Sequence, residues 1–184
     1  MPKVNPAAHE ARRCRARPVA MKGCKMNSGE KLIITKADLD EDSTYIGAAD
    51  VTDWNGDIEI AANLGNVKFK KSIRAKGFIR ALYGTDISAE CGISAGGGIS
   101  AECGISAGGN ISAEWGISAG SGISAGGGIS AGGGISAKWI ECGLRIFAGI
   151  SNAYIPQGVD AQIRAEIRKG IIAFGEHVPP VKGE

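Results

Sequence analysis

The hydrophobic pattern in the middle of the chain is a strict repeat of six residues. An Ile-Ser-Ala triplet recurs nine times at this spacing, beginning at Ile87, Ile93, Ile99, Ile105, Ile111, Ile117, Ile123, Ile129 and Ile135. Side chains alternate along a β-strand, so the Ile and Ala of a triplet share one side and the serine takes the other. The pattern therefore predicts a row of short strands that each bury Ile and Ala.

The residues between the triplets are mostly glycine, and they limit which architecture fits. In a helix, residues six apart fall on different faces, and each glycine costs about 0.5–1 kcal/mol relative to alanine. A flexible Gly/Ser linker gives no reason for isoleucine at a strict spacing. Short strands joined by corners are typical of a parallel β-solenoid. We expect the corner glycines to be needed because they tolerate a positive φ.

The six-residue spacing extends beyond the central block. Val67, Ile73 and Ile79 precede it, Ile140 and Ile146 follow it, and weaker traces begin near residue 45. We divide the chain into a disordered basic arm (1–25), an acidic segment leading into the solenoid (26–66), the β-solenoid (67–150), a C-terminal cap (151–174) and a loose tail (175–184). The fold class is all-β, with one short helix in the cap.

The number of residues in each coil has two candidate values. Glu90, Glu102 and Glu114 lie twelve apart, so a flat coil of twelve residues would stack them at about 4.8 Å. Like charges in that register repel each other. A three-sided coil of eighteen residues places them on different sides, and it is favoured over the flat coil for this reason.

These hexads resemble those of the hexapeptide-repeat parallel β-helix proteins, and the Gly-Ile-Ser-Ala-Gly-Gly texture resembles the polymer-forming, bactofilin-like β-helices. Both resemblances cover about residues 67–150 and concern the fold. Hexapeptide-repeat proteins usually have a small residue two places before the aliphatic one, where this chain has Gly97, Cys103 and Trp115. That family includes acyltransferases, which implies acyl-CoA and a loop histidine as base. Here His9 and His177 both lie in the flanks.

The segment after the repeat predicts the cap. Val159, Ile163, Ile167 and Ile171 lie four apart, with Asp160 as N-cap and Gly170 as stop. We expect an amphipathic helix over 160–169 that closes the open end of the solenoid. Residues 170–173 are equally consistent with one more solenoid strand.

Charge is distributed unevenly along a chain whose formal net charge is +2. Residues 1–25 are strongly basic and could contact nucleic acid through phosphates. Residues 38–59 contain acids but no Lys or Arg, and residues 68–80 contain bases but no acid. The basic segment is either a solvated face or a docking surface for an anionic partner. Trp115 and Trp139, each standing at a corner, either fill the core or act as contact anchors. The candidate contact surface consists of Lys68, Lys70, Lys71, Arg74, Trp115 and Trp139.

No constellation of residues indicates catalysis. The five cysteines form no CxxC pair, and the two histidines stand beside thiols that are too widely scattered for a zinc site. No phosphate-binding glycine motif opens a helix. We therefore expect no enzyme activity, no metal and no cofactor. The prediction is a cytoplasmic scaffold that binds a protein partner or associates with itself, without a membrane. The alternatives are a mobile-element inhibitor of a nucleic-acid enzyme, a hexapeptide-repeat acyltransferase and an ice-binding protein.

Overall fold

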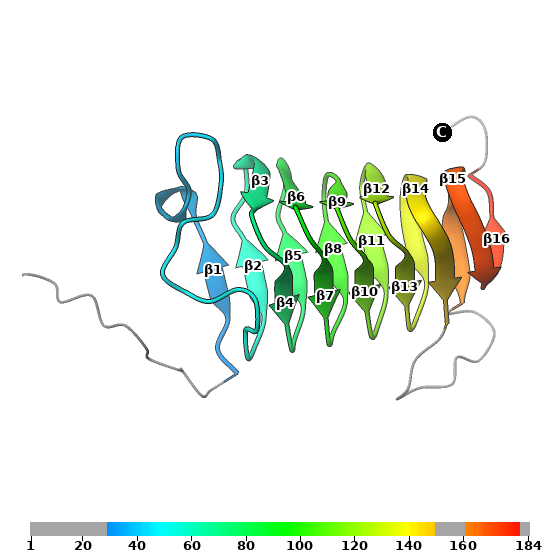
Figure 1. Cartoon of the computed structure of the whole chain (residues 1–184), viewed down its shortest axis with the longest axis horizontal. Coiled ribbons are helices and arrows are strands. Elements are labelled where there is room, and N and C mark those ends of the chain that lie inside the picture. The colour runs from blue at the N-terminus through cyan, green and yellow to red at the C-terminus, as the bar shows by residue number, and fades with distance from the viewer. Residues whose placement is uncertain (1–28, 150–160, 181–184) are drawn as a thin grey trace, which may run out of the picture.

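The computed structural model describes residues 29–149 and 161–180, and these residues form a parallel β-solenoid of about six turns. The coils follow one another along a single axis from β1 to β16 (Figure 1). The described residues form no helix apart from one 3-10 turn, η1 (Lys36–Asp38). The all-β solenoid expected from the repeat is confirmed.

Three parallel ladders of strands make the sides of the solenoid. The first face contains β3 (Gly65–Phe69), β6 (Thr85–Ala89), β9 (Ile105–Ala107) and β12 (Gly122–Ala125). The second face contains β4 (Ile73–Ala75), β7 (Ile93–Ala95), β10 (Ile111–Ala113) and β13 (Ile129–Ala131). The third face contains β1 (Leu32–Ile34), β2 (Ile58–Ile60), β5 (Ile79–Ala81), β8 (Ile99–Ala101) and β11 (Ile117–Ala119). Two long strands, β14 (Ile135–Ala148) and β15 (Gln162–Phe174), pass around all three faces, and β16 (Glu176–Val178) follows on the third.

The register stacks identical residues on one another. On the second face Ile93, Ile111 and Ile129 are aligned, and the serines and alanines of the same strands are aligned with them. Each step in this block is eighteen residues, which places Glu90, Glu102 and Glu114 at three different corners. The coil is therefore three-sided, the arrangement that the repulsion between stacked carboxylates favours.

The core is a continuous column of isoleucine and alanine. The repeat isoleucines from Ile87 to Ile135 are at most 1% exposed, and the alanines of the triplets from Ala89 to Ala131 are also buried. The serine of each triplet faces outward. Fully burying an isoleucine contributes roughly 1.5–3 kcal/mol to stability. The stacked isoleucines therefore stabilise the core of a chain that contains few aromatic residues.

The corner glycines are needed for a different reason from the one that the sequence suggested. No glycine between 87 and 139 has a positive φ. At Gly108 and Gly126, an added Cβ would instead meet the carbonyl oxygen of Glu90 or Gly108 in the preceding coil. The close approach of neighbouring coils therefore excludes a side chain at these two corners, and the expectation of positive φ was wrong.

Larger side chains close the N-terminal end of the core. Leu39 and Val51 are buried there, and the Tyr45 ring packs on Phe69 with 5.6 Å between centroids. Isolated bridges connect this irregular coil to the regular ones, Thr44 with Lys68 and Trp54 with Ala75. The acidic segment thus takes part in the stack, and β1 extends the third face to Leu32.

The predicted helix over 160–169 is wrong, because β15 occupies residues 162–174. Ile163 and Ala165 are fully buried and alternate with exposed Arg164, and Ile163 aligns with Ile135 of β14. A spacing of four residues is an even number, so it fits a strand as well as a helix. The expected strand at 170–173 forms part of β15. Residues 176–178, assigned to a loose tail, form β16. Asp160 and the basic arm lie outside the described residues.

Candidate binding surfaces

The basic residues that the sequence singled out encircle one coil. Lys68 points outward from the first face and Arg74 from the second, while Lys70 and Lys71 stand at the corner between them. All four are exposed. The six-residue spacing of Lys68, Arg74 and Arg80 places one cation on each face. We refer to Lys68, Lys70, Lys71, Arg74, Lys76 and Arg80 as the basic belt.

Acids of the preceding coil lie beside this belt. Glu59 is aligned with Arg80 across the third face, and its carboxylate forms an ion pair of 2.6 Å with Lys31. The hydroxyl and the N–H of Thr52 bind Asp50 and lower the pKa of that carboxyl, and the charge of Lys71 lowers it further. The charge of the belt is therefore partly balanced by the chain itself.

The two repeat tryptophans lie outside the Ile/Ala core and differ in their surroundings. The Trp115 side chain is 64% exposed and meets Phe78 edge to face, with 5.8 Å between ring centroids. Trp139 is half-buried, and the Arg168 guanidinium lies 4.7 Å from its ring centroid. An added Cβ at Gly122 would also meet the Trp139 ring. Trp139 therefore packs against neighbouring coils, whereas Trp115 remains open to a partner.

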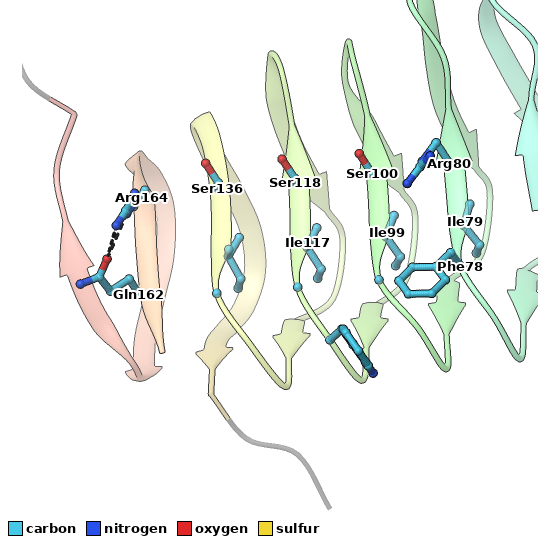
Figure 2. Close-up of a pocket in the computed structure, with 15 residues that line it drawn as sticks. Phe78, Ile79, Arg80, Ile99, Ser100, Ile117, Ser118, Ser136, Gln162 and Arg164 are labelled. Carbon is cyan, nitrogen blue, oxygen red and sulfur yellow. Dashed lines mark hydrogen bonds between the residues drawn. The ribbon is translucent and has the colours of Figure 1, made fainter. Parts of the chain in front are cut away.

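A groove on the third face brings together residues that sequence reasoning did not connect. It encloses about 460 Å³, and polar side chains follow one another along it. Figure 2 shows Arg80, Ser100, Ser118, Ser136 and Arg164 in one row across successive coils. Phe78 and Trp115 border the groove at the corner between the second and third faces. Among the sequence candidates, only Trp115 lines it.

The sequence contained a signal for this row that only the coil length makes visible. Ser100, Ser118 and Ser136 are eighteen residues apart, and Arg80 precedes Ser100 in the ladder with a spacing lengthened by two residues. Thr85 lies within this longer coil, and its buried hydroxyl donates a hydrogen bond to the Ala61 carbonyl at 2.8 Å. Arg164 was not predicted to belong to this row because its segment was expected to be helical.

The three cysteines of the described residues are free thiols in different environments. Cys91 is exposed, Cys103 is partly exposed, and Cys142 is buried. Cys91 and Cys103 lie at different corners, as an eighteen-residue coil requires. Burial raises the pKa of the Cys142 thiol above its ordinary value.

Cys142 is therefore expected to resist alkylation in the folded protein. At mildly alkaline pH its raised pKa keeps the thiol protonated, and only a thiolate is an effective nucleophile. Peptide mass spectrometry after a timed iodoacetamide pulse would measure this, with Cys91 expected to react first and the protein in denaturant as the control. Equal rates for Cys91 and Cys142 in the native protein would contradict the buried position of Cys142.

The described residues offer few groups for chemistry. No three of their His, Cys, Asp and Glu side chains come together in a way that could hold a metal ion. His177, the one histidine among them, has Nε2 at 2.9 Å from the Ala165 carbonyl oxygen, so it packs against β15. None of their helices is long and apolar enough to cross a membrane.

The fold defines the class of protein, a parallel β-solenoid built from repeats, and supports the likeness to β-helix proteins at the level of the fold. No family model, no curated protein and no solved structure matches the chain. Its function must therefore be argued from its own surfaces.

Proposed function

We propose that this protein is a non-enzymatic β-solenoid scaffold that joins to a second copy of itself through its C-terminal coils. The observation that carries the proposal is an apolar patch on the second face of the last two coils. Leu144 and Ile171 are more than 60% exposed, and Phe174 is 50% exposed. Together with Phe147, these residues form what we refer to as the C-terminal patch.

The patch stands out against the rest of its face. Three successive coils present serine outward there, at Ser94, Ser112 and Ser130, and the next outward position is Phe147. Outward serines are well hydrated, whereas exposed apolar side chains that gather in a patch are typical of interaction sites.

The last coil also presents an unpaired strand edge. β15 pairs with β14 on one side, whereas on its other side only residues 162–164 pair with β16 among the described residues. From Glu166 to Phe174 the outer edge of β15 meets no further strand in the described part of the chain. Such an edge accepts another strand by backbone hydrogen bonding.

A second copy is the partner that these features favour. In an end-to-end two-fold arrangement the outer edge of β15 pairs with the same edge of the second copy, and the patches of the two copies then lie side by side on one joined face. Within residues 29–60 the opposite end offers no comparable edge, because β1 has only three residues and an irregular coil follows it. The expected product is a rod of double length with an N-terminal coil at each end.

Replacing Ile171 with aspartate is expected to shift the protein from dimer to monomer. Two-fold symmetry brings both copies of the new charge into one largely apolar contact, where they lose their hydration. The desolvation penalty exceeds what pairing with Arg145, the register partner of residue 171 in β14, returns. Sedimentation velocity over a dilution series measures the shift. Ile46→Asp is the matched control, since Ile46 is 62% exposed at the other end of the rod. A wild-type monomer at every concentration, or equal effects of both variants, would contradict self-association.

Docking of an anionic partner on the basic belt is the second candidate. The exposure of Lys68, Lys70, Lys71 and Arg74 supports it. Capture of a stoichiometric partner by the full chain from nuclease-treated lysate, lost on reversing the charges of Lys70, Lys71 and Arg74, would favour it over self-assembly. Recovery of the bait alone as an oligomer would favour the C-terminal patch.

A further inference from the structure

The groove on the third face has cations at both of its ends. Arg80 and Arg164 are separated by four coil steps through Ser100, Ser118 and Ser136. At about 4.8 Å for each step, their Cα atoms lie roughly 19 Å apart along the solenoid axis. No acidic side chain lines the groove between them.

Both guanidinium groups are available to an anion. Neither Arg80 nor Arg164 forms an ion pair within the described residues. Arg164 is held in place by the Gln162 side-chain oxygen, which accepts hydrogen bonds from Nε at 3.0 Å and from one terminal nitrogen at 2.7 Å (Figure 2). Its other terminal nitrogen has no hydrogen-bond partner among the described residues. A fixed guanidinium is the side chain best suited to bind a carboxylate.

The middle of the groove is polar and uncharged. Ser100, Ser118 and Ser136 present three hydroxyl groups in register, each able to donate one hydrogen bond and accept others. A ligand that lies along them must itself carry both donors and acceptors at a spacing close to the coil rise. Sugar hydroxyls meet this requirement, because one pyranose unit of an extended chain is about as long as the coil rise of about 4.8 Å.

The aromatic pair supplies an apolar border. Phe78 and Trp115 are both exposed, and they stabilise each other edge to face at the corner beside the hydroxyl row. A sugar ring has an apolar face of C–H groups, and an exposed indole is a suitable surface for it. The hydroxyl groups, the indole and the two terminal cations are therefore suited to different parts of one ligand.

We propose that the third-face groove binds an acidic oligosaccharide of about five sugars laid along the solenoid axis, with one sugar at each coil step. A uronate sugar at each end places its carboxylate at Arg80 or Arg164, and neutral sugars lie over the serines. A single-stranded nucleic acid fits less well. It carries a phosphate at every nucleotide, so several phosphates would lie over the uncharged serines between the two cations. An extended peptide finds no free backbone here, because β5, β8 and β11 are paired on both sides. This site is independent of the C-terminal patch on the second face.

Isothermal calorimetry of the full chain with a synthetic linear pentasaccharide, which carries a uronate at each end and neutral sugars between, tests the proposal. We expect Arg80→Gln, Arg164→Gln and Trp115→Ala each to weaken binding roughly tenfold, as the loss of one charge-assisted contact implies for the arginines. Arg74→Gln is the matched control, since it removes an exposed arginine of the same belt from the second face, and its affinity should equal that of the wild type. The dimethyl ester of the same pentasaccharide, which has lost both carboxylate charges, should bind far more weakly.

Three results would overturn the proposal. The first is an absence of binding of this pentasaccharide to the folded wild-type chain. The second is an equal loss of affinity in Arg74→Gln, which would mean that the anion binds anywhere on the belt. The third is tighter binding of an oligothymidylate of similar length with the same dependence on Arg80 and Arg164, which would make the groove a nucleic-acid site. Loss of binding only in Ile171→Asp would instead show that the site depends on self-association.

Discussion

Replacing Ile111 with alanine is expected to lower the free energy of unfolding by about 2–5 kcal/mol, the usual cost of truncating a fully buried isoleucine. Ile111 is 0% exposed and is stacked between Ile93 below and Ile129 above. The cavity therefore opens in the middle of the rod, where neither end can relax around it. In a solenoid each coil is stabilised by its neighbours, so both adjoining interfaces are weakened together.

Urea denaturation followed by circular dichroism measures this loss. Ser112→Ala is the matched control, because Ser112 is the next residue of the same strand and faces outward. Its effect should stay within about 0.5 kcal/mol, as for most surface substitutions. If the two variants were equally destabilised, the alternation of buried and exposed residues in the triplets would be wrong.

The strands and the core could be predicted because the sequence of each triplet is enough to show which of its side chains are buried. Ile, Ser and Ala alternate in the same way at every repeat, so a local rule with a period of two assigns each side chain to the inside or the outside. Predicting the number of residues in each coil required a relation between residues that are far apart in the sequence. The repulsion of stacked Glu90, Glu102 and Glu114 provided it and favoured a three-sided coil.

The C-terminal segment shows where such local rules fail. The four-residue spacing of Ile163 and Ile167 suits a helix, and the same residues fit the alternation of a strand. The stack decides between them, since Ile163 continues the ladder of Ile135 and gives β14 a partner for its outer edge. A helix there would leave the backbone groups of β14 unpaired.

The candidate site was found only in part, because a surface row on a solenoid consists of residues far apart in sequence. A run of six cations along the chain suggested one patch, but a spacing of six residues turns successive cations onto successive faces. The row from Arg80 to Arg164 becomes visible only when the register of five strands is known. Trp115 was recognised beforehand because it interrupts a run of corner glycines.

Replacing Gly170 with alanine is expected to destabilise the C-terminal coils by about 1–3 kcal/mol. Gly170 has a φ of +116°, a backbone conformation that residues with a side chain rarely adopt. It lies where β15 shifts its register against β14, between the pairs Glu141–Lys169 and Arg145–Ile171. An added Cβ would also meet the Sγ atom of Cys142, which is buried in the core. Both the bulge and the packing below it therefore require glycine.

Gly133→Ala is the control that separates this effect from glycine replacement in general. An added Cβ at Gly133 would find its nearest neighbour at 3.6 Å, and its φ is not positive. Such a substitution is expected to be neutral or to stabilise by about 0.4–1 kcal/mol, because it restricts the unfolded chain. Amide hydrogen exchange should then show faster exchange of β15 in Gly170→Ala and unchanged exchange in Gly133→Ala. Unchanged exchange of β15 in both variants would mean that the bulge tolerates a side chain and that β15 does not depend on the strained turn.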